Sequence, residues 1–572
     1  MQSISPTGSW WYQSATALRR LVHLVFALGC LGGFVLLAPA EAAAACTTSN
    51  VNHGNTNGGK TYRINAVSLD LLTTIGDREA AASAVHLSAS TWNNHANAGY
   101  FRIGLSTSDT SLPSTKAACD AAGINYSLVV VKNQNGAKAV TSGACENAGV
   151  ATQFVITINT KDDSGNPWNF RTHASVMGAS QWDLVQTLTH EFGHTLRLGH
   201  PSSEDATMTP TTMGTNRSRD LYQWDLECAA SISGHRSLTG YRYTHSSSFS
   251  AESAFTSGTG WNVANVSAGV SSSATPGTWV WASSVKQSAC TNWLSSFSTG
   301  TAKCTSISTT VGMSPTEAVW REDPTNDRIF YADYTEQPTA YDASSTHRVA
   351  YRRSTDQFTS QISGSLSSCT AMSGFFVCNG TTPVQTGKHV SVAWDNFNNR
   401  TVFAWVNQNR SNNAQEREIR VAIGNISNTT LPQHESLGVQ SSVTPGVACE
   451  SFSAGGFDCI VAYVDQTSTL NRVRTRRFWA GAGTNKYDLH LDASVHDVGV
   501  APTTSRIAAW YNSTNSKFYI ATRPQRVNEL IEVFESADGA TWTLLTTLNS
   551  SVVGPSAASV WDGPVNALVL AR

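Results

Sequence analysis

One stretch of the chain carries the residue types that hold a metal ion and use it. Residues 190–200 read His-Glu-Phe-Gly-His-Thr-Leu-Arg-Leu-Gly-His. In a helix, His190 and His194 lie on one face and can bind one ion together. His200 follows where a turn after the helix can bring a third imidazole to the ion. Three neutral imidazoles leave one position of a tetrahedral zinc open, which is a catalytic arrangement, and Glu191 is placed to act on water there.

A helix is expected to position these residues. Ser180, with Asp183 three residues later, is a variant of the capping box and predicts the start of the helix. Apolar residues then follow at helical spacing: Trp182, Val185, Leu188, Phe192 and Leu196. On the same helical wheel the two histidines share a side that can face a cleft.

This stretch resembles the zinc-binding helix of the metzincin metallopeptidases, and most closely that of the matrixin branch. The family pattern is H-E-x-x-H-x-x-G-x-x-H followed by a methionine turn. After His200 the chain reads Pro-Ser-Ser-Glu-Asp-Ala-Thr-Met-Thr-Pro, so Met208 falls where a matrixin has its turn methionine. The resemblance implies a zinc metalloendopeptidase that acts on proteins or peptides. It assigns zinc binding to His190, His194 and His200, general-base catalysis to Glu191, and support of the site to Met208.

One residue departs from the family pattern, because Arg197 stands where the family has glycine. That glycine lets the backbone leave the helix and turn toward the metal, and a non-glycine residue in a left-handed conformation costs about 1–2 kcal/mol. The departure bears on the geometry of His200. It favours an alternative, an adhesion or carbohydrate-binding protein whose protease domain has decayed. The intact Glu191 and the three histidines argue against that alternative.

The first 45 residues have the pattern of a secretory signal peptide. Arg19 and Arg20 precede an apolar run at 21–39, and small residues follow up to Ala45. A membrane anchor is the alternative, but the three glycines in the run and its alanine-rich end favour cleavage. No other segment is long and apolar enough to span a bilayer. We therefore expect a secreted protein with no membrane contact after the signal is removed.

The cysteines agree with export. Ten of the eleven cysteines lie beyond the signal, and an even number in an exported chain suggests disulfides. Close spacing suggests the pairs Cys119–Cys145, Cys290–Cys304, Cys369–Cys378 and Cys449–Cys459. Cys46 and Cys228 are left over, and a bridge between them would tie the mature N-terminus to the last helix of the first domain. Sequence alone leaves this connectivity open.

The charge balance excludes some classes of partner. The chain has 38 basic and 40 acidic residues, so nothing in it predicts electrostatic capture of nucleic acid or of an anionic membrane. Its low charge and its many turn-forming residues fit an exported, β-rich protein. A chain of 572 residues should hold at least two domains.

Four segments are expected: a signal peptide at 1–45, a matrixin-like zinc metallopeptidase domain of α+β class at 46–236, a Ser/Gly-rich linker or first propeller strands at 237–277, and a repeat-built β domain at 278–572. Within the second segment we expect a helix at 79–92, strands at 100–105, 128–132 and 154–159, the zinc helix, the Met208 turn and a last helix at about 220–231. Calcium is compatible with the resemblance but is not placed, because the Asp/Asn-rich turn at 161–166 fits a solvated loop equally well.

The C-terminal segment repeats a hairpin-like unit. Each unit is an apolar strand ending in an aromatic residue, followed by an Asp/Asn-rich turn; the aromatic residues are Trp320, Trp394, Tyr463, Trp510 and Trp561. Their intervals predict a β-propeller of five to seven blades, with a stack of β-sandwich modules as the alternative. Ser536–Trp542 resembles the Asp-box turn of sialidase-like propellers. We expect this domain to bind a glycan or a protein; a glycosidase function finds no acid pair with interpretable spacing.

Overall fold

The computed structural model describes residues 60–93, 101–104, 106–174, 178, 180–201 and 206–209, short pieces between 219 and 229, and strands between Thr239 and Ala571, with side chains in parts of 391–547. The predicted signal peptide and Cys46 lie outside the described residues. No helix in the described part of the chain has both the length and the apolar character needed to cross a membrane.

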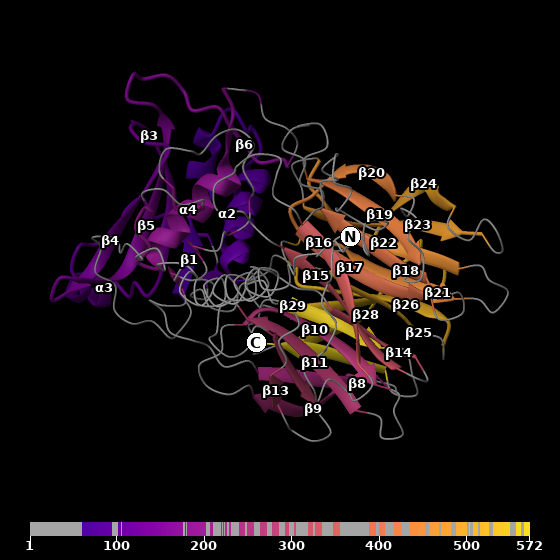
Figure 1. Cartoon of the computed structure of the whole chain (residues 1–572). Helices are drawn as coiled ribbons and strands as arrows, with labels where there is room; N and C mark the ends of the chain where they lie inside the picture. Colours follow the sequence, from indigo (N-terminus) through magenta and orange to yellow (C-terminus); the bar gives the residue numbers. More distant parts are fainter. Residues whose placement is uncertain are drawn as a thin grey trace, which may run out of the picture. The chain divides into compact units, whose positions relative to one another are not determined.

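A five-stranded sheet is the scaffold of the N-terminal part, drawn from indigo to purple in Figure 1. Its strands are β1 (Lys60–Ile64), β2 (Phe101–Ile103), β3 (Ser127–Asn135), β4 (Ala139–Asn147) and β5 (Val150–Lys161). They lie in the order β2-β1-β3-β5-β4. The first four strands in that order are parallel, whereas β4 runs antiparallel to β5 and forms one edge. The predicted strands at 100–105, 128–132 and 154–159 are confirmed, and β1 and β4 are additional.

The helices of this part are η1 (Ser68–Leu71), α2 (Arg78–Asn93), α3 (Lys116–Ala121) and α4 (Leu184–Thr195). The short strands β6 (Phe170–Arg171) and β7 (Trp182–Asp183) pair in parallel just before α4. Helices α2 and α4 contact each other, and α4 also contacts β4 and β5 (Figure 1). The predicted helices at 79–92 and around 190 are confirmed. Of the predicted last helix, Trp224, Asp225, Cys228 and Ala229 are helical, and the remainder lies outside the described residues.

The predicted start of the zinc helix is wrong. Ser180 does not cap α4; Asp183 does, and its carboxylate accepts the backbone N–H groups of Val185 and Gln186 at 3.0 and 3.4 Å. Trp182 lies in β7 and not on the helix. The predicted cap lies three residues before the observed one. Pairing of β6 with β7 holds Trp182 and Asp183 extended, so the helix begins only after Asp183.

An aromatic cluster joins the inner face of α4 to the sheet. The ring of Phe192 lies 5.1 Å from that of Tyr62 and 4.9 Å from that of Phe101, and all three side chains are buried. Trp92 of α2 is fully buried and donates its indole N–H to the Thr189 carbonyl at 2.7 Å. Because truncating a buried Phe costs about 3–5 kcal/mol, Phe192 makes a large contribution to the packing of α4 on the sheet.

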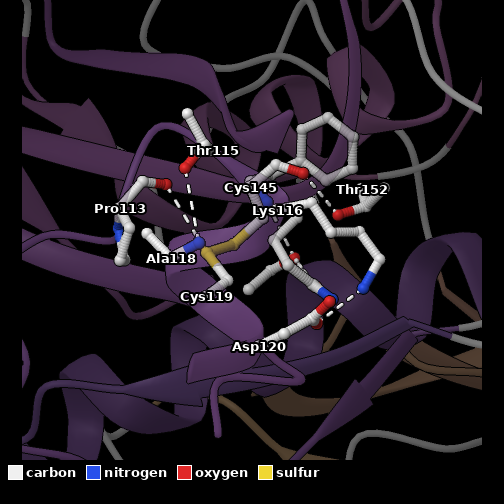
Figure 2. The surroundings of a disulfide bond; sticks show 11 residues. Pro113, Thr115, Lys116, Ala118, Cys119, Asp120, Cys145 and Thr152 are labelled. Carbon is white, nitrogen blue, oxygen red and sulfur yellow. Dashed lines mark hydrogen bonds and ion pairs between the residues drawn. A yellow bond between two sulfur atoms is a disulfide. The ribbon is translucent and has the colours of Figure 1, made fainter. Parts of the chain in front are cut away.

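A disulfide between Cys119 and Cys145 ties α3 to the edge strand β4 (Figure 2). Beside it, the backbone N–H of Cys145 donates to the Pro113 carbonyl at 2.9 Å, and the Thr115 hydroxyl caps α3 by accepting the N–H of Ala118. The bridge thus secures the far end of the edge strand.

The other cysteines have different outcomes. Cys449 and Cys459 form a second disulfide, and Cys228 is disulfide-bonded. The pairs expected at 290–304 and 369–378, and the Cys46 end of the expected bridge to Cys228, lie outside the described side chains.

The remaining described chain is all-β. Its sheets are antiparallel and successive in sequence. The first holds β10 (Val263–Ser271), β11 (Gly277–Ser284), β12 (Asn292–Ser296) and β13 (Ala302–Cys304), and the second holds β14 (Ala318–Asp323), β15 (Asn326–Tyr334) and β16 (His347–Ser354). The third holds β17 (Lys388–Asp395), β18 (Arg400–Val406), β19 (Glu418–Asn425) and β20 (His434–Gln440), and the fourth holds β21 (Gly446–Ser451), β22 (Phe457–Asp465), β23 (Arg472–Ala480) and β24 (Leu489–Asp497). The fifth holds β25 (Ala508–Asn512), β26 (Lys517–Thr522), β27 (Leu530–Ser536) and β28 (Thr543–Asn549).

The sixth sheet joins the two ends of the all-β region. It holds β29 (Ser556–Trp561) and β30 (Asn566–Ala571) beside β8 (Thr239–His245) and β9 (Phe249–Thr256). Each of the six sheets contributes one strand to a closed ring of contacts. Each strand of the ring contacts the next in the order β10, β14, β17, β21, β25 and β29, and β29 contacts β10. Strands β8, β9 and β10 fall within the segment 237–277.

The turn between β27 and β28 has the local structure that its sequence suggested. Ser536 accepts the N–H of Gly539, and Asp538 accepts those of Ala540 and Thr541. Burial raises the pKa of Asp538, but these hydrogen bonds outweigh it and lower that pKa to about 2. Trp542 donates its indole N–H to the Thr475 hydroxyl of the neighbouring sheet at 3.0 Å. The motif therefore stabilises the fold locally.

Candidate metal centre

The three predicted histidines meet at one point. The ligand atoms of His190, His194 and His200 all lie within 4.8 Å of one another. The Nε2 atom of His200 is 3.1 Å from the Nε2 atoms of both His190 and His194. His190 and His194 come from successive turns of α4, and His200 reaches them from the segment after the helix. The structure thus brings together three nitrogens that are ten residues apart at most in sequence.

Backbone carbonyls orient two of the rings. The Nδ1 atom of His190 is 2.8 Å from the Thr207 carbonyl, and that of His194 is 2.8 Å from the Leu198 carbonyl. Because a carbonyl only accepts, each Nδ1 must carry the proton. The Nε2 atoms then present lone pairs toward the common centre, which is the orientation that metal-binding histidines take.

Burial keeps the imidazoles neutral. It lowers the pKa of His190 well below its ordinary value and that of His194 to about 4, and partial desolvation also lowers the pKa of His200, the most exposed of the three. Neutral imidazole is the ligand form, so no proton has to leave near pH 7 before a metal binds.

These residues fit zinc. The lone pairs on Nε2 of His190 and His194 point to a centre that His200 also reaches, which is an arrangement that suits a cation. Two nitrogens bound to a tetrahedral zinc at about 2.0–2.1 Å stand about 3.3–3.4 Å apart, close to the separations of 3.1 Å in this cluster. Three nitrogen ligands leave a fourth position open for catalysis.

Glu191 is held beside this cluster by the edge strand β4. Its side chain is 5% exposed, and its Oε2 accepts the Thr141 hydroxyl at 2.7 Å. Burial raises the pKa of Glu191 to about 7, against the hydroxyl and the backbone N–H of Thr141, which lower it. A carboxylate with a pKa near neutrality can both take and return a proton at physiological pH.

Met208 lies directly beneath the helix. It is fully buried, and its backbone N–H and that of Thr207 donate to the buried carboxylate of Asp225 at 3.2 and 2.7 Å. A Cβ at Gly193 would collide with the Met208 sulfur and would lie 2.8 Å from a ring carbon of Trp92. The glycine between the two histidines of α4 is therefore required by the close approach of Met208.

Arg197 occupies the conformation that the family pattern reserves for glycine. Its φ is 73°, in the left-handed region. The backbone N–H of Arg197 donates to the His194 carbonyl, and that of Leu198 donates to the Gly193 carbonyl. These two bonds form a Schellman motif with arginine in the glycine position. The turn places the Leu198 carbonyl against Nδ1 of His194, so Arg197 retains the expected geometry at the cost of a strained backbone.

A buried carboxylate anchors the start of α4. One oxygen of Asp183 caps the helix, and the other accepts Arg219 at 2.7 Å and Arg417 at 3.2 Å. All three side chains are at most 5% exposed. Burial alone would raise the pKa of Asp183, but the two guanidiniums hold it below its ordinary value. Arg417 precedes β19, so a residue of the all-β region takes part in this anchor.

Sequence reasoning missed several of these residues. Thr141, Asp225 and Arg219 carry no local signal, because each reaches the site from a distant segment through one side chain. Asp183 did carry a local signal, because an Asp before an apolar run is typical of a helix N-cap, but the cap was predicted at Ser180.

The candidate calcium turn receives no support. The Asp162 carboxylate accepts the N–H groups of Ser164 and Asn166 at 2.9 and 2.8 Å, which accounts for its role in the turn.

Comparison with known proteins bears on the N-terminal part. The matrixin family model matches residues 83–234, about a quarter of the 572-residue chain. The match includes α2, the histidine cluster and Met208. It supports a metzincin-like domain here and, in general, a function of the zinc metalloprotease type. A search of curated proteins finds no match.

Several carbohydrate-active enzymes are among the solved structures that are similar to the chain. They include an exo-β-1,3-galactanase from Phanerochaete chrysosporium (13% identity, 41% of this chain and 49% of that chain, TM-score 0.27). Also similar is a sialidase from Trypanosoma rangeli (14% identity, 40% of this chain and 36% of that chain, TM-score 0.23). A third is an α-L-arabinofuranosidase from Fusarium graminearum (10% identity, 56% of this chain and 81% of that chain, TM-score 0.29). This chain covers less than two thirds of the galactanase and of the sialidase, and TM-scores this low carry no argument about its activity. The family match and the histidine cluster together support a metzincin-like domain in the N-terminal part.

Proposed function

We propose that this protein is a zinc-dependent metalloendopeptidase. The observation that carries the proposal is the convergence of three Nε2 atoms, two of them 3.1 Å from the third, beside the buried carboxylate of Glu191. His190, His194 and His200 would hold the ion. When bound, zinc supplies a Lewis acid that polarises the scissile carbonyl and lowers the pKa of water toward neutrality.

Glu191 performs the proton transfers. Its carboxylate, whose pKa is raised by burial, accepts a proton from the attacking water and returns it to the amine that leaves. Thr141 holds Oε2 of that carboxylate, and the backbone of Glu191 is fixed by α4. The base is therefore oriented before substrate arrives, which lowers the entropic part of the barrier.

The edge of β4 offers a place for an extended substrate. Among the described residues, β4 pairs with β5 on one side. On its other side, the segment at 113–115 covers the far end of β4, through the Thr115–Glu146 bridge and the N–H groups of Cys145 and Glu146, which donate to the carbonyls of Pro113 and Ser114. A peptide can add to such an edge as a further strand. Because Thr141 of this strand contacts Glu191, a peptide paired with β4 would lie across the histidine cluster.

The test pairs metal analysis with peptide cleavage. Full-length protein should contain about one zinc per chain and should cleave denatured casein, whereas Glu191→Ala should retain the zinc and lose the cleavage. Zinc without cleavage in both proteins would favour the decayed-protease alternative. Absence of zinc from protein that is folded and was purified without chelators would overturn the proposal.

The all-β region is proposed to be a six-bladed β-propeller that binds a protein or a glycan. The cyclic contacts of the first strands and the sheet shared by the two ends of the region support this arrangement. Binding of the full chain to a glycan array, and its loss on competition with the free glycan, would identify a glycan ligand.

Export is proposed from the residue pattern of the first 45 positions. N-terminal sequencing of protein recovered from the medium of an expressing cell should begin near residue 46. An uncleaved N-terminus retained in the membrane would support the anchor alternative instead.

A further inference from the structure

A lysine and two tryptophans form a second cluster, where β4 begins and just before α4. The Nζ atom of Lys138 lies 3.6 Å from the ring centroid of Trp182 and 5.4 Å from that of Trp168. The two indoles meet edge to face at 5.7 Å. All three side chains are partly exposed, so the cluster is open to a ligand.

The cluster is rigidly placed. Trp168 donates its indole N–H to the Gly136 carbonyl at 3.1 Å, and Trp182 lies in β7 immediately before the anchored Asp183. The carbonyl of Lys138 accepts the N–H of Asn159 at 3.0 Å. Three segments therefore converge, and the backbone at Lys138 and the ring of Trp168 are held in place by hydrogen bonds.

The ammonium has no anionic partner among the described residues. Indole faces attract a cation but accept no conventional hydrogen bond, so the three N–H donors of Lys138 are not satisfied by them. Partial burial lowers the pKa of Lys138, which shows that the charge is partly desolvated. A carboxylate that reached this ammonium would form a charge-assisted hydrogen bond in a site from which water is already partly removed.

The position of Lys138 relates it to the substrate. It directly precedes β4, three residues before Thr141, the residue that contacts Glu191. At about 3.3 Å per residue, the two positions lie about 10 Å apart along the edge. A peptide extended along β4 would thus bring a residue about three positions from its scissile bond to Lys138.

We propose that Lys138, held against Trp168 and Trp182, selects substrates that carry a carboxylate about three residues from the scissile bond. The carboxylate is that of an Asp or Glu side chain or of a free C-terminus. This inference rests on the proposed peptidase function and adds a substrate class to it.

Cleavage profiling tests the selection. Zinc-loaded full-length protein is incubated with a proteome-derived peptide library, and the residues flanking each cleaved bond are read by mass spectrometry. We expect acidic residues to be enriched at one position about three residues from the bond, roughly tenfold in kcat/KM over the amide twin of the best peptide. Lys138→Gln should abolish the preference and Lys138→Arg should keep it. Lys116→Gln, which removes an exposed lysine of α3, should leave it unchanged.

A binding measurement separates failure of this inference from failure of the peptidase proposal. Fluorescein-labelled alanine octapeptides, each with one Asp at a different position, and their Asn twins are titrated into the full-length Glu191→Gln variant and followed by anisotropy. An Asp peptide that binds roughly tenfold more tightly than its twin, and only when Lys138 is present, supports the carboxylate site even if no peptide is ever cleaved. Equal binding of the twins, or an acidic preference that survives Lys138→Gln, overturns it.

Discussion

Arg197 offers the sharpest test of how the third histidine is positioned. It holds a φ of 73° in the glycine position of the Schellman motif that ends α4. Replacing it with glycine removes the clash between Cβ and the backbone while it keeps the same hydrogen bonds. The Nε atom of Arg197 is buried and has no hydrogen-bond partner among the described residues, so replacement removes no hydrogen bond at that atom.

The expected gain follows from two opposing terms. Relief of the left-handed conformation contributes about 1–2 kcal/mol. The greater freedom of glycine in the unfolded chain offsets about 0.5–1 kcal/mol of that. The net stabilisation is about 0–1.5 kcal/mol, which corresponds to a rise in Tm of up to roughly 6 °C for a domain of 150–250 residues.

The assay is thermal unfolding of the full chain, with and without zinc, followed by the signal of the N-terminal part. Arg197→Lys keeps both the strain and the charge and should show no gain. Arg197→Asn should lie between arginine and glycine, because asparagine tolerates the left-handed region better than most residues. Arg102→Gly, in the middle of β2, controls for glycine itself and should lower Tm.

The order of the Tm values of these variants decides whether the backbone at 197 is strained. If Arg197→Gly lowers Tm as much as Arg102→Gly does, the backbone at 197 is not strained. If Arg197→Lys raises Tm as much as Arg197→Gly, the effect belongs to the side chain and the argument from φ is refuted.

Three further predictions concern buried polar groups. Asp183→Asn should destabilise the protein by about 3–5 kcal/mol in urea unfolding, because it leaves two buried guanidiniums without their anion, while Asp70→Asn, at an exposed ion pair, should change little. Thr141→Val should lower kcat roughly tenfold and move the acidic limb of the pH profile upward, since the Glu191 carboxylate loses a donor that lowers its pKa; Thr141→Ser should restore both. Lys60 is 8% exposed, and burial lowers its pKa from 10.5 to about 7. Because the unfolded chain binds more protons between pH 7 and 10.5, the free energy of unfolding of the wild type should rise with pH in that range, by up to about 1.4 kcal/mol per pH unit. Lys60→Met should remove this rise. An unchanged slope in Lys60→Met would show that other groups cause it.

The elements that carry strong periodicity could be predicted from the sequence. Helix α4 and its buried face of Val185, Leu188 and Phe192 follow from apolar spacing, and α2 follows from its alanine-rich run. The position of Met208 beneath the helix followed from the family resemblance and not from any local pattern. What it rests on, the missing Cβ of Gly193, is visible only in the packing.

Other elements could not be predicted for identifiable reasons. Strand β4 reads Ala-Val-Thr-Ser-Gly-Ala, and small polar residues on an edge strand give no clear alternation. The strand nevertheless supplies Thr141, the residue that holds Glu191. In the all-β region, Tyr463 lies in β22, the second strand of its sheet, whereas Trp394 and Trp510 lie in first strands. The repeat of aromatic residues therefore marked the sheets without a constant place in them.

The central claim is that the histidine cluster binds zinc for peptide hydrolysis with Glu191 as the base. The most direct measurement is the metal content of the full-length protein together with its cleavage of casein, for the wild type and for Glu191→Ala. The account predicts about one zinc per chain in both proteins and cleavage by the wild type alone. Cleavage that survives Glu191→Ala, or folded wild-type protein that takes up no zinc, would contradict it.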